Sequence, residues 1–236
     1  MQSTGAPNSF AVGSSSRRAR RRPVIAVVRR HGTVRRSTMI PAGYMAKRVE
    51  PRPDWIKADA VVDIYSVSSC VSAHFADYIN YWRHNGYWLF DSPQVISELA
   101  DENSIDLKGT QLFYYEVYER EFNAGNGQWA DFAADASFKT KVLIPEAKLL
   151  HGFDVVTFYA RTSAECSPLS CNSLATEVAT NQHCLLPSLD RAMGLLEEGK
   201  FDNTEPGPYR VFAVYSVEWP DQTAINRPFA MGDLCP

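Results

Sequence analysis

The residues best suited to chemistry lie between positions 161 and 184. The stretch from Arg161 to Ser173 is rich in small polar side chains and contains the thiols of Cys166 and Cys171, and His183 and Cys184 follow it. A thiol beside an imidazole can become a nucleophile, because the base removes the thiol proton. We therefore predict Cys171 or Cys166 as a nucleophile with His183 as its base.

Two asparagines and one arginine complete this candidate site. Asn172 or Asn181 could orient the imidazole of His183 or stabilise an oxyanion. We predict Asn172 as part of the catalytic group, and Asn181 and Arg161 as residues that bind a ligand.

A metal site built from the same residues is the second hypothesis. Cys166, Cys171, His183 and Cys184 are thiolate and imidazole ligands of the kind that zinc prefers. The spacing argues against it, because adjacent side chains on a strand, as at His183 and Cys184, point to opposite faces. We therefore assign no metal ligand, and the sequence identifies no cofactor. In a purely structural interpretation, Cys184 is a small core residue and local side-chain hydrogen bonds stabilise the serine-rich loop.

Other chemistry-bearing residues have simpler explanations. His74 and His84 flank a predicted helix, where exposed or capping histidines are common, and Glu116, Glu119 and Glu121 suit the solvated face of a strand. Glycine-rich phosphate loops, the His-Glu-x-x-His motif and the Gly-x-Ser-x-Gly motif are absent from the sequence.

The composition indicates a folded protein with a substantial core. The chain has 236 residues, of which 45% are hydrophobic and 12% aromatic. No apolar run approaches the roughly 18 residues that a membrane-spanning helix needs, so we expect no membrane partner. Five cysteines are an odd number in a chain too long to need disulfides, which favours a reducing compartment and predicts a cytoplasmic location.

The charges divide the chain into two unlike parts. Residues 1–50 carry eleven Lys and Arg and one acid, Glu50, whereas residues 51–236 carry thirteen Lys and Arg and twenty-six Asp and Glu. We predict a disordered arm over 1–50, a globular domain over 51–220 and a tail over 221–236. The arm has three explanations: contact with nucleic acid, a targeting peptide, or a misplaced start that makes Met45 the first residue.

The acidic part predicts alternating strands and helices. Apolar and β-branched runs indicate strands, whereas the 3.6-residue period and the serines at 92 and 188 indicate helices. The predicted strands are 61–67, 87–90, 112–122, 128–132, 154–159, 183–186 and 209–219, and the predicted helices cover 75–82 and the segments after Ser92 and Ser188.

Similar spacing in the two halves of this part suggests an internal duplication. Asn85, Leu89, Ser92 and Leu99 align with Asn181, Leu185, Ser188 and Leu195, and 61–65 aligns with 155–159. We therefore predict an α+β fold, with a mixed or mainly antiparallel sheet, helices on one face, and halves at about 60–122 and 153–219 related by a pseudo-twofold axis.

Two classes of function remain open. We expect a module that binds a small molecule or a protein partner between the two halves, because the usual enzyme motifs are missing. The alternative is a thiol-dependent or metal-dependent enzyme that uses Cys166, Cys171 and His183. Nucleic acid is an expected partner only if the arginine-rich arm is genuine.

Overall fold

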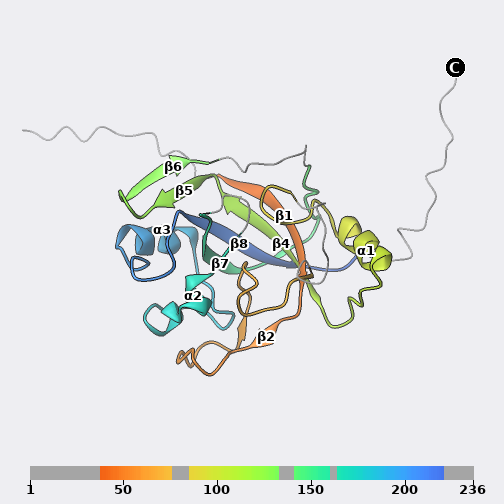
Figure 1. Cartoon of the computed structure of the whole chain (residues 1–236), viewed down its shortest axis with the longest axis horizontal. Helices are drawn as coiled ribbons and strands as arrows, with labels where there is room; N and C mark the ends of the chain where they lie inside the picture. Colours follow the sequence, from red (N-terminus) through yellow and green to blue (C-terminus); the bar gives the residue numbers. More distant parts are fainter. Residues whose placement is uncertain (1–37, 76–84, 133–140, 160–163, 221–236) are drawn as a thin grey trace, which may run out of the picture. The chain divides into compact units, whose positions relative to one another are not determined.

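The described part of the chain is built around one antiparallel sheet. The computed structural model describes residues 38–75, 85–132, 141–159 and 164–220. Four long strands lie next to one another in the order β1, β4, β8 and β7 (Figure 1). Of two short strands, β5 follows β4 in the chain and pairs with β8, and β6 pairs with β5. The long strands are β1 (Met39–Lys47), β4 (Gln111–Tyr118), β8 (Tyr209–Val217) and β7 (Leu149–Thr157), and the short ones are β5 (Arg120–Asn123) and β6 (Gln128–Asp131).

Two amphipathic helices pack against this sheet. Helix α1 (Pro93–Glu102) contacts β1, and helix α3 (Leu189–Glu197) contacts β7 and β8. Both begin as the sequence predicts, because the hydroxyl oxygens of Ser92 and Ser188 accept a backbone N–H of the first turn. The predicted α+β class with a mainly antiparallel sheet is therefore confirmed.

Strand β1 corrects the predicted boundary of the domain. The sequence analysis placed residues 1–50 outside the fold, yet Met39–Lys47 pairs with β4 along its length and is buried from Ala42 onward. The error arose because the arginines at positions 17–36 dominated the composition of this stretch. The predictions for the arm before residue 38, the helix over 75–82 and the tail from 221 lie wholly or largely outside the described residues.

Three of the predicted strands are mostly loops or turns. The segment 61–67 forms only β3 (Asp63–Ile64), which pairs with β2 (Glu50–Pro51). The segments 87–90 and 183–186 each make a single bridge to a long strand. In both segments one residue has a left-handed backbone, with φ of 59° at Trp88 and 61° at Cys184, and this breaks the extended path.

An asparagine organises each of these two turns in the same way. Its side-chain oxygen accepts the N–H groups two and four residues later, and its amide donates to a carbonyl oxygen of a long strand. The first set joins Asn85 to Tyr87, Leu89 and Ala42 of β1. The second set joins Asn181 to His183, Leu185 and His151 of β7.

The strand opposite each turn carries a glycine at the point of closest approach. A Cβ atom placed on Gly43 would lie 2.7 Å from the carbonyl oxygen of Phe90, and one placed on Gly152 would lie 2.7 Å from that of Leu186. Both glycines follow an irregularity in strand pairing. The first turn therefore packs on β1 and the second on β7, so the strand that matches β7 in this comparison is β1 and not the predicted strand at 61–65.

Candidate functional site

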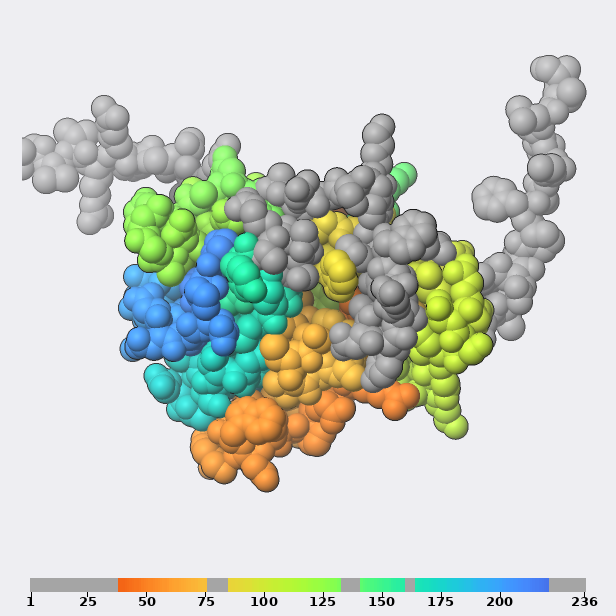
Figure 2. Space-filling view, viewed as in Figure 1, coloured from red at the N-terminus to blue at the C-terminus, as the bar shows by residue number. Residues whose placement is uncertain are grey.

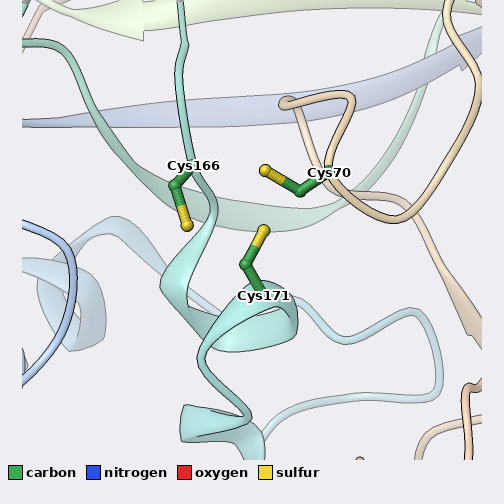
Figure 3. Close-up of side chains that lie close together, drawn as sticks. All are labelled: Cys70, Cys166 and Cys171. Carbon is green, nitrogen blue, oxygen red and sulfur yellow. The ribbon is translucent and has the colours of Figure 1, made fainter.

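Three thiols converge on one point between segments that are far apart in the sequence. The Sγ atoms of Cys70, Cys166 and Cys171 all lie within 4.8 Å of one another and point together (Figure 3). Cys166 is buried, Cys171 is partly exposed and Cys70 is exposed, so the group is open to solvent on one side. The loop that follows β3 supplies Cys70 and lies against the segment around α2 (Figure 2).

The segment after β7 places Cys166 and Cys171 through local hydrogen bonds. Thr157, at the end of β7, donates its N–H to the carbonyl oxygen of Cys166 (2.8 Å), and its hydroxyl accepts the N–H of Cys166 (3.0 Å). Pro168 then opens helix α2 (Pro168–Cys171), which is a single turn, and Cys171 donates its N–H to the carbonyl oxygen of Ser167. This single helical turn therefore brings the thiol of Cys171 close to that of Cys166.

Two buried charged residues hold the loop that carries Cys70. The ammonium group of Lys47, on β1, donates to the carbonyl oxygens of Ser66 and Ser68. The carboxylate of Asp154, on β7, accepts the N–H of Val67 at 2.8 Å. Because these strands lie at opposite edges of the four-stranded core, the loop bridges the two sides of the sheet.

Asp154 also connects this loop to the segment around α2. Its Oδ2 atom accepts the hydroxyl of Ser167 at 2.7 Å, and the hydroxyl oxygen of Ser167 accepts the N–H of Ser68 at 3.3 Å. Burial raises the pKa of Asp154 to about 6, although the bond from Ser167 opposes the shift. Among the residues described, Oδ1 of Asp154 is buried without a hydrogen-bond partner, which adds to the free-energy cost of burying this carboxylate.

The three thiols differ in how readily they ionise. Hydrogen bonds from Cys166 and then Cys171 lower the pKa of Cys70, and the positive charge of Lys47 acts in the same direction. The bonds of Cys166 with Cys171 and Cys70 raise the pKa of Cys166, and so does burial. The neutral Cys70 thiol donates to the carbonyl oxygen of Glu165 at 3.2 Å. Cys70 is therefore the thiol that loses its proton first.

Some of the site residues predicted from the sequence lie at the three thiols, and others lie elsewhere in the fold. Asn172 lies next to it, where its Oδ1 atom accepts the thiol of Cys166 at 3.5 Å. Cys184 is buried outside the group, and burial raises its pKa. The side chain of Asn181 forms the hydrogen bonds that organise the turn at 181–185. Arg161 lies outside the described residues.

His183 belongs to a separate polar cluster, and the structure does not bring it among the three thiols. Its Nδ1 atom lies 2.6 Å from Oδ1 of Asp63, and its ring stacks on Tyr65 with centroids 4.0 Å apart. His151 packs edge-on against both rings, and its Nε2 atom lies 2.8 Å from the hydroxyl of Ser216. These contacts fasten the loop before Cys70 to the turn at 181–185.

Three residues around the thiol group were not predicted from the sequence: Cys70, Lys47 and Asp154. Cys70 lies in the serine-rich run Ser66–Ser72, a composition like that around Cys166, and this is the one signal that could have found it. The two charged residues lie in strands with no motif, and only their burial in the fold marks them.

Comparisons with known proteins add no further assignment. No protein-family model, curated protein or solved structure matches this chain. In the described residues, no helix has the length and apolar character needed to cross a membrane.

The arrangement of the thiols suits one metal ion. Zinc binds thiolates at about 2.3 Å, which places the sulfur atoms of a tetrahedral site about 3.8 Å apart. The sulfur atoms of the three cysteines lie within 4.8 Å of one another, so only small side-chain movements would bring them to this spacing. Three soft ligands with one exposed side can therefore hold a thiophilic ion.

Proposed function

We propose that this protein binds a single thiophilic metal ion, with Zn²⁺ as the reference, through Cys70, Cys166 and Cys171. The observation that carries the proposal is the convergence of three thiols from two distant segments. Thiolate ligands favour zinc and copper(I) over magnesium, calcium and manganese. This is the metal-dependent alternative of the sequence analysis, with Cys70 in the place of His183.

The ligand count supports a reactive centre over a structural one. Structural zinc sites have four protein ligands, whereas catalytic sites have three and keep one position for water or substrate. The described residues supply three thiols, and the Cys70 side faces solvent. The extensive core also leaves little need for a metal to stabilise the fold.

The proposal is tested by metal analysis of the full chain. Protein purified without chelator is expected to contain about one equivalent of metal, and Co²⁺ loaded in its place should give the charge-transfer absorption of thiolate ligands. Cys70→Ser, Cys166→Ser and Cys171→Ser should each reduce this absorption and the metal content. Cys184→Ser is the matched control, because Cys184 is buried but lies outside the group. Failure of the wild-type protein to bind Zn²⁺ or Co²⁺ would refute the proposed metal site.

A groove on another part of the molecule supports the small-molecule binding hypothesis as a second candidate. It has a volume of about 940 Å³, and its lining includes Tyr44, Gln94, Lys148, Ser216 and Trp219. Ser216 bonds to His151 of the polar cluster, so a ligand here would touch that cluster. Ser216→Trp should fill the groove and abolish binding of any small molecule found by thermal-shift screening, and unchanged binding would exclude this location.

We also propose that the two halves arose by duplication. The equivalent asparagine turns, the positive φ angles at Trp88 and Cys184 and the close glycines support this. The proposed metal site then joins the halves, because Cys70 comes from the first half and the other two thiols come from the second. Free thiols at such a site favour a reducing compartment, such as the cytoplasm.

A further inference from the structure

We propose that the fourth coordination position of this metal centre takes the sulfur atom of a small-molecule thiol. The proposal rests on the metal site proposed above and names the class of substrate that the site would bind. It follows from the charge of the ligand set, its softness and the charged residues around it.

The charge of the ligand set disfavours activation of water. Three thiolates bound to a divalent ion leave one net negative charge, whereas three neutral imidazoles leave two positive charges. Zinc held by three imidazoles lowers the pKa of its bound water to about 7 because the ion keeps its positive charge. Donation from Cys70, Cys166 and Cys171 weakens this effect, so bound water stays neutral and leaves easily.

The softness of the ligand set favours sulfur in the open position. Four thiolates form one of the standard tetrahedral zinc sites, and the described part of this chain gathers three. The remaining thiol there, Cys184, is buried outside the group. A thiol from solution can complete the set from the side on which Cys70 is exposed.

Polar groups around the site offset the added negative charge. The ammonium group of Lys47 holds the Cys70 loop, where it donates to the carbonyl oxygen of Ser68 at 3.1 Å. The hydroxyls of Ser68 and Ser170 lie 3.8 Å and 4.0 Å from Sγ of Cys171, where they can donate to a thiolate. Asp154 is the opposing acid on this loop, and its carboxylate accepts the N–H of Val67 and the hydroxyl of Ser167.

The binding step exchanges water for thiolate without any redox change. The S–H bond of the incoming thiol breaks, its sulfur gives an electron pair to the metal, the bound water leaves and one proton passes to the buffer. A thiol bound in this way is held as a thiolate at neutral pH, well below its usual pKa of about 8.5. The metal thus prepares a sulfur nucleophile.

The test uses the full chain loaded with Co²⁺ or Zn²⁺ and two probes that differ in one atom, N-acetylcysteine and N-acetylserine. N-acetylcysteine should raise the thiolate-to-Co²⁺ absorption by about a third, the change from three sulfur ligands to four. Titration calorimetry of the zinc protein in buffers of different ionisation enthalpy should show release of about one proton for each thiol bound. N-acetylserine should do neither.

The outcomes separate this inference from the proposed function. A protein that loads no metal overturns both. A protein that loads metal through three thiolates but responds to neither probe overturns the thiol inference and leaves the metal site standing. If the Co²⁺ spectrum shows four thiolates before any probe is added, and three in Cys235→Ser, the chain supplies its own fourth ligand and the inference is also overturned. Cys235 lies outside the described residues.

Discussion

Replacing Gly152 by alanine tests how tightly β7 and the turn at 181–186 are packed. Gly152 has φ of 150°, a region that side chains disfavour, and its new Cβ atom would lie 2.7 Å from the carbonyl oxygen of Leu186. The strained backbone costs about 1–3 kcal/mol. Relief of the clash moves the bridge between Phe153 and Leu186, whose two backbone hydrogen bonds of 2.9 Å and 2.8 Å contribute about 1 kcal/mol each. We therefore expect a loss of about 3–5 kcal/mol in the free energy of unfolding.

Two matched variants separate the clash from the backbone strain. Gly127 has φ of 66° and no atom within 4 Å of the new Cβ, so Gly127→Ala should cost only about 1–2 kcal/mol. Gly43→Ala should cost nearly as much as Gly152→Ala, because its Cβ meets Phe90 in the same way. Urea unfolding followed by tryptophan fluorescence measures all three variants. The reasoning is refuted if Gly152→Ala costs no more than Gly127→Ala.

Three further predictions concern the site and the start of the fold. Cys166→Ala removes the largest influence that lowers the pKa of Cys70, so the pH–rate profile for iodoacetamide labelling of Cys70 in metal-free protein should shift to higher pH, and an unchanged profile would contradict this. The pKa of Asp154 is higher in the folded protein than in the unfolded chain, so the folded state binds more protons and becomes less stable, by up to about 3 kcal/mol, as the pH rises from about 4 to 6. Asp154→Asn should remove this loss, and urea unfolding of both proteins at several pH values measures it; an equal loss in both would show that another group causes it. A chain that starts at Met39 should melt like the described domain, whereas one that starts at Met45 should melt more than about 10 °C lower, because it lacks Met39–Tyr44 of β1. Equal melting temperatures, measured by circular dichroism, would show that Met39–Tyr44 is dispensable for stability.

The comparison of Asp154→Asn with the wild-type protein separates the effect of Asp154 on the pH dependence of stability from the effect of His74. His74 is buried and its pKa is lowered by burial and then by Lys47, so the stability that it contributes is lost as the pH falls. This dependence has the opposite sign to that of Asp154 and is common to both proteins. The difference between the two pH profiles therefore reports Asp154 alone.

Local signals in the sequence were sufficient for α1 and α3 and for two of the three clustered thiols. Serine caps, a proline at the first helical position and an apolar stripe are properties of neighbouring residues, so α1 and α3 could be predicted from Ser92 and Ser188. Cys166 and Cys171 were found in the same way, because one short segment holds both thiols and the Ser167–Pro168 pair that starts α2.

The remaining features depend on contacts between distant residues. The turns at 87–90 and 183–186 have the composition of strands, but Asn85 and Asn181 redirect the backbone through bonds to another strand. Cys70 carries no spacing signal toward Cys166, because the fold alone brings the two segments together. His183 was assigned to the thiols on its position in the sequence, whereas the structure pairs it with Asp63.

Two charged residues near the thiols stand opposite apolar residues when β1 and β7 are aligned on their glycines. Counting from the glycine in each strand, Asp154 of β7 stands where β1 has the buried Met45, and Lys47 of β1 stands where β7 has the buried Val156. An apolar residue at either position would avoid the cost of burying a charge. Both charges instead hold the loop that presents Cys70, Lys47 through two carbonyl oxygens and Asp154 through the N–H of Val67. Each strand therefore carries one buried charge at a position where the other strand is apolar, and each charge supports the thiol group through the loop that presents Cys70.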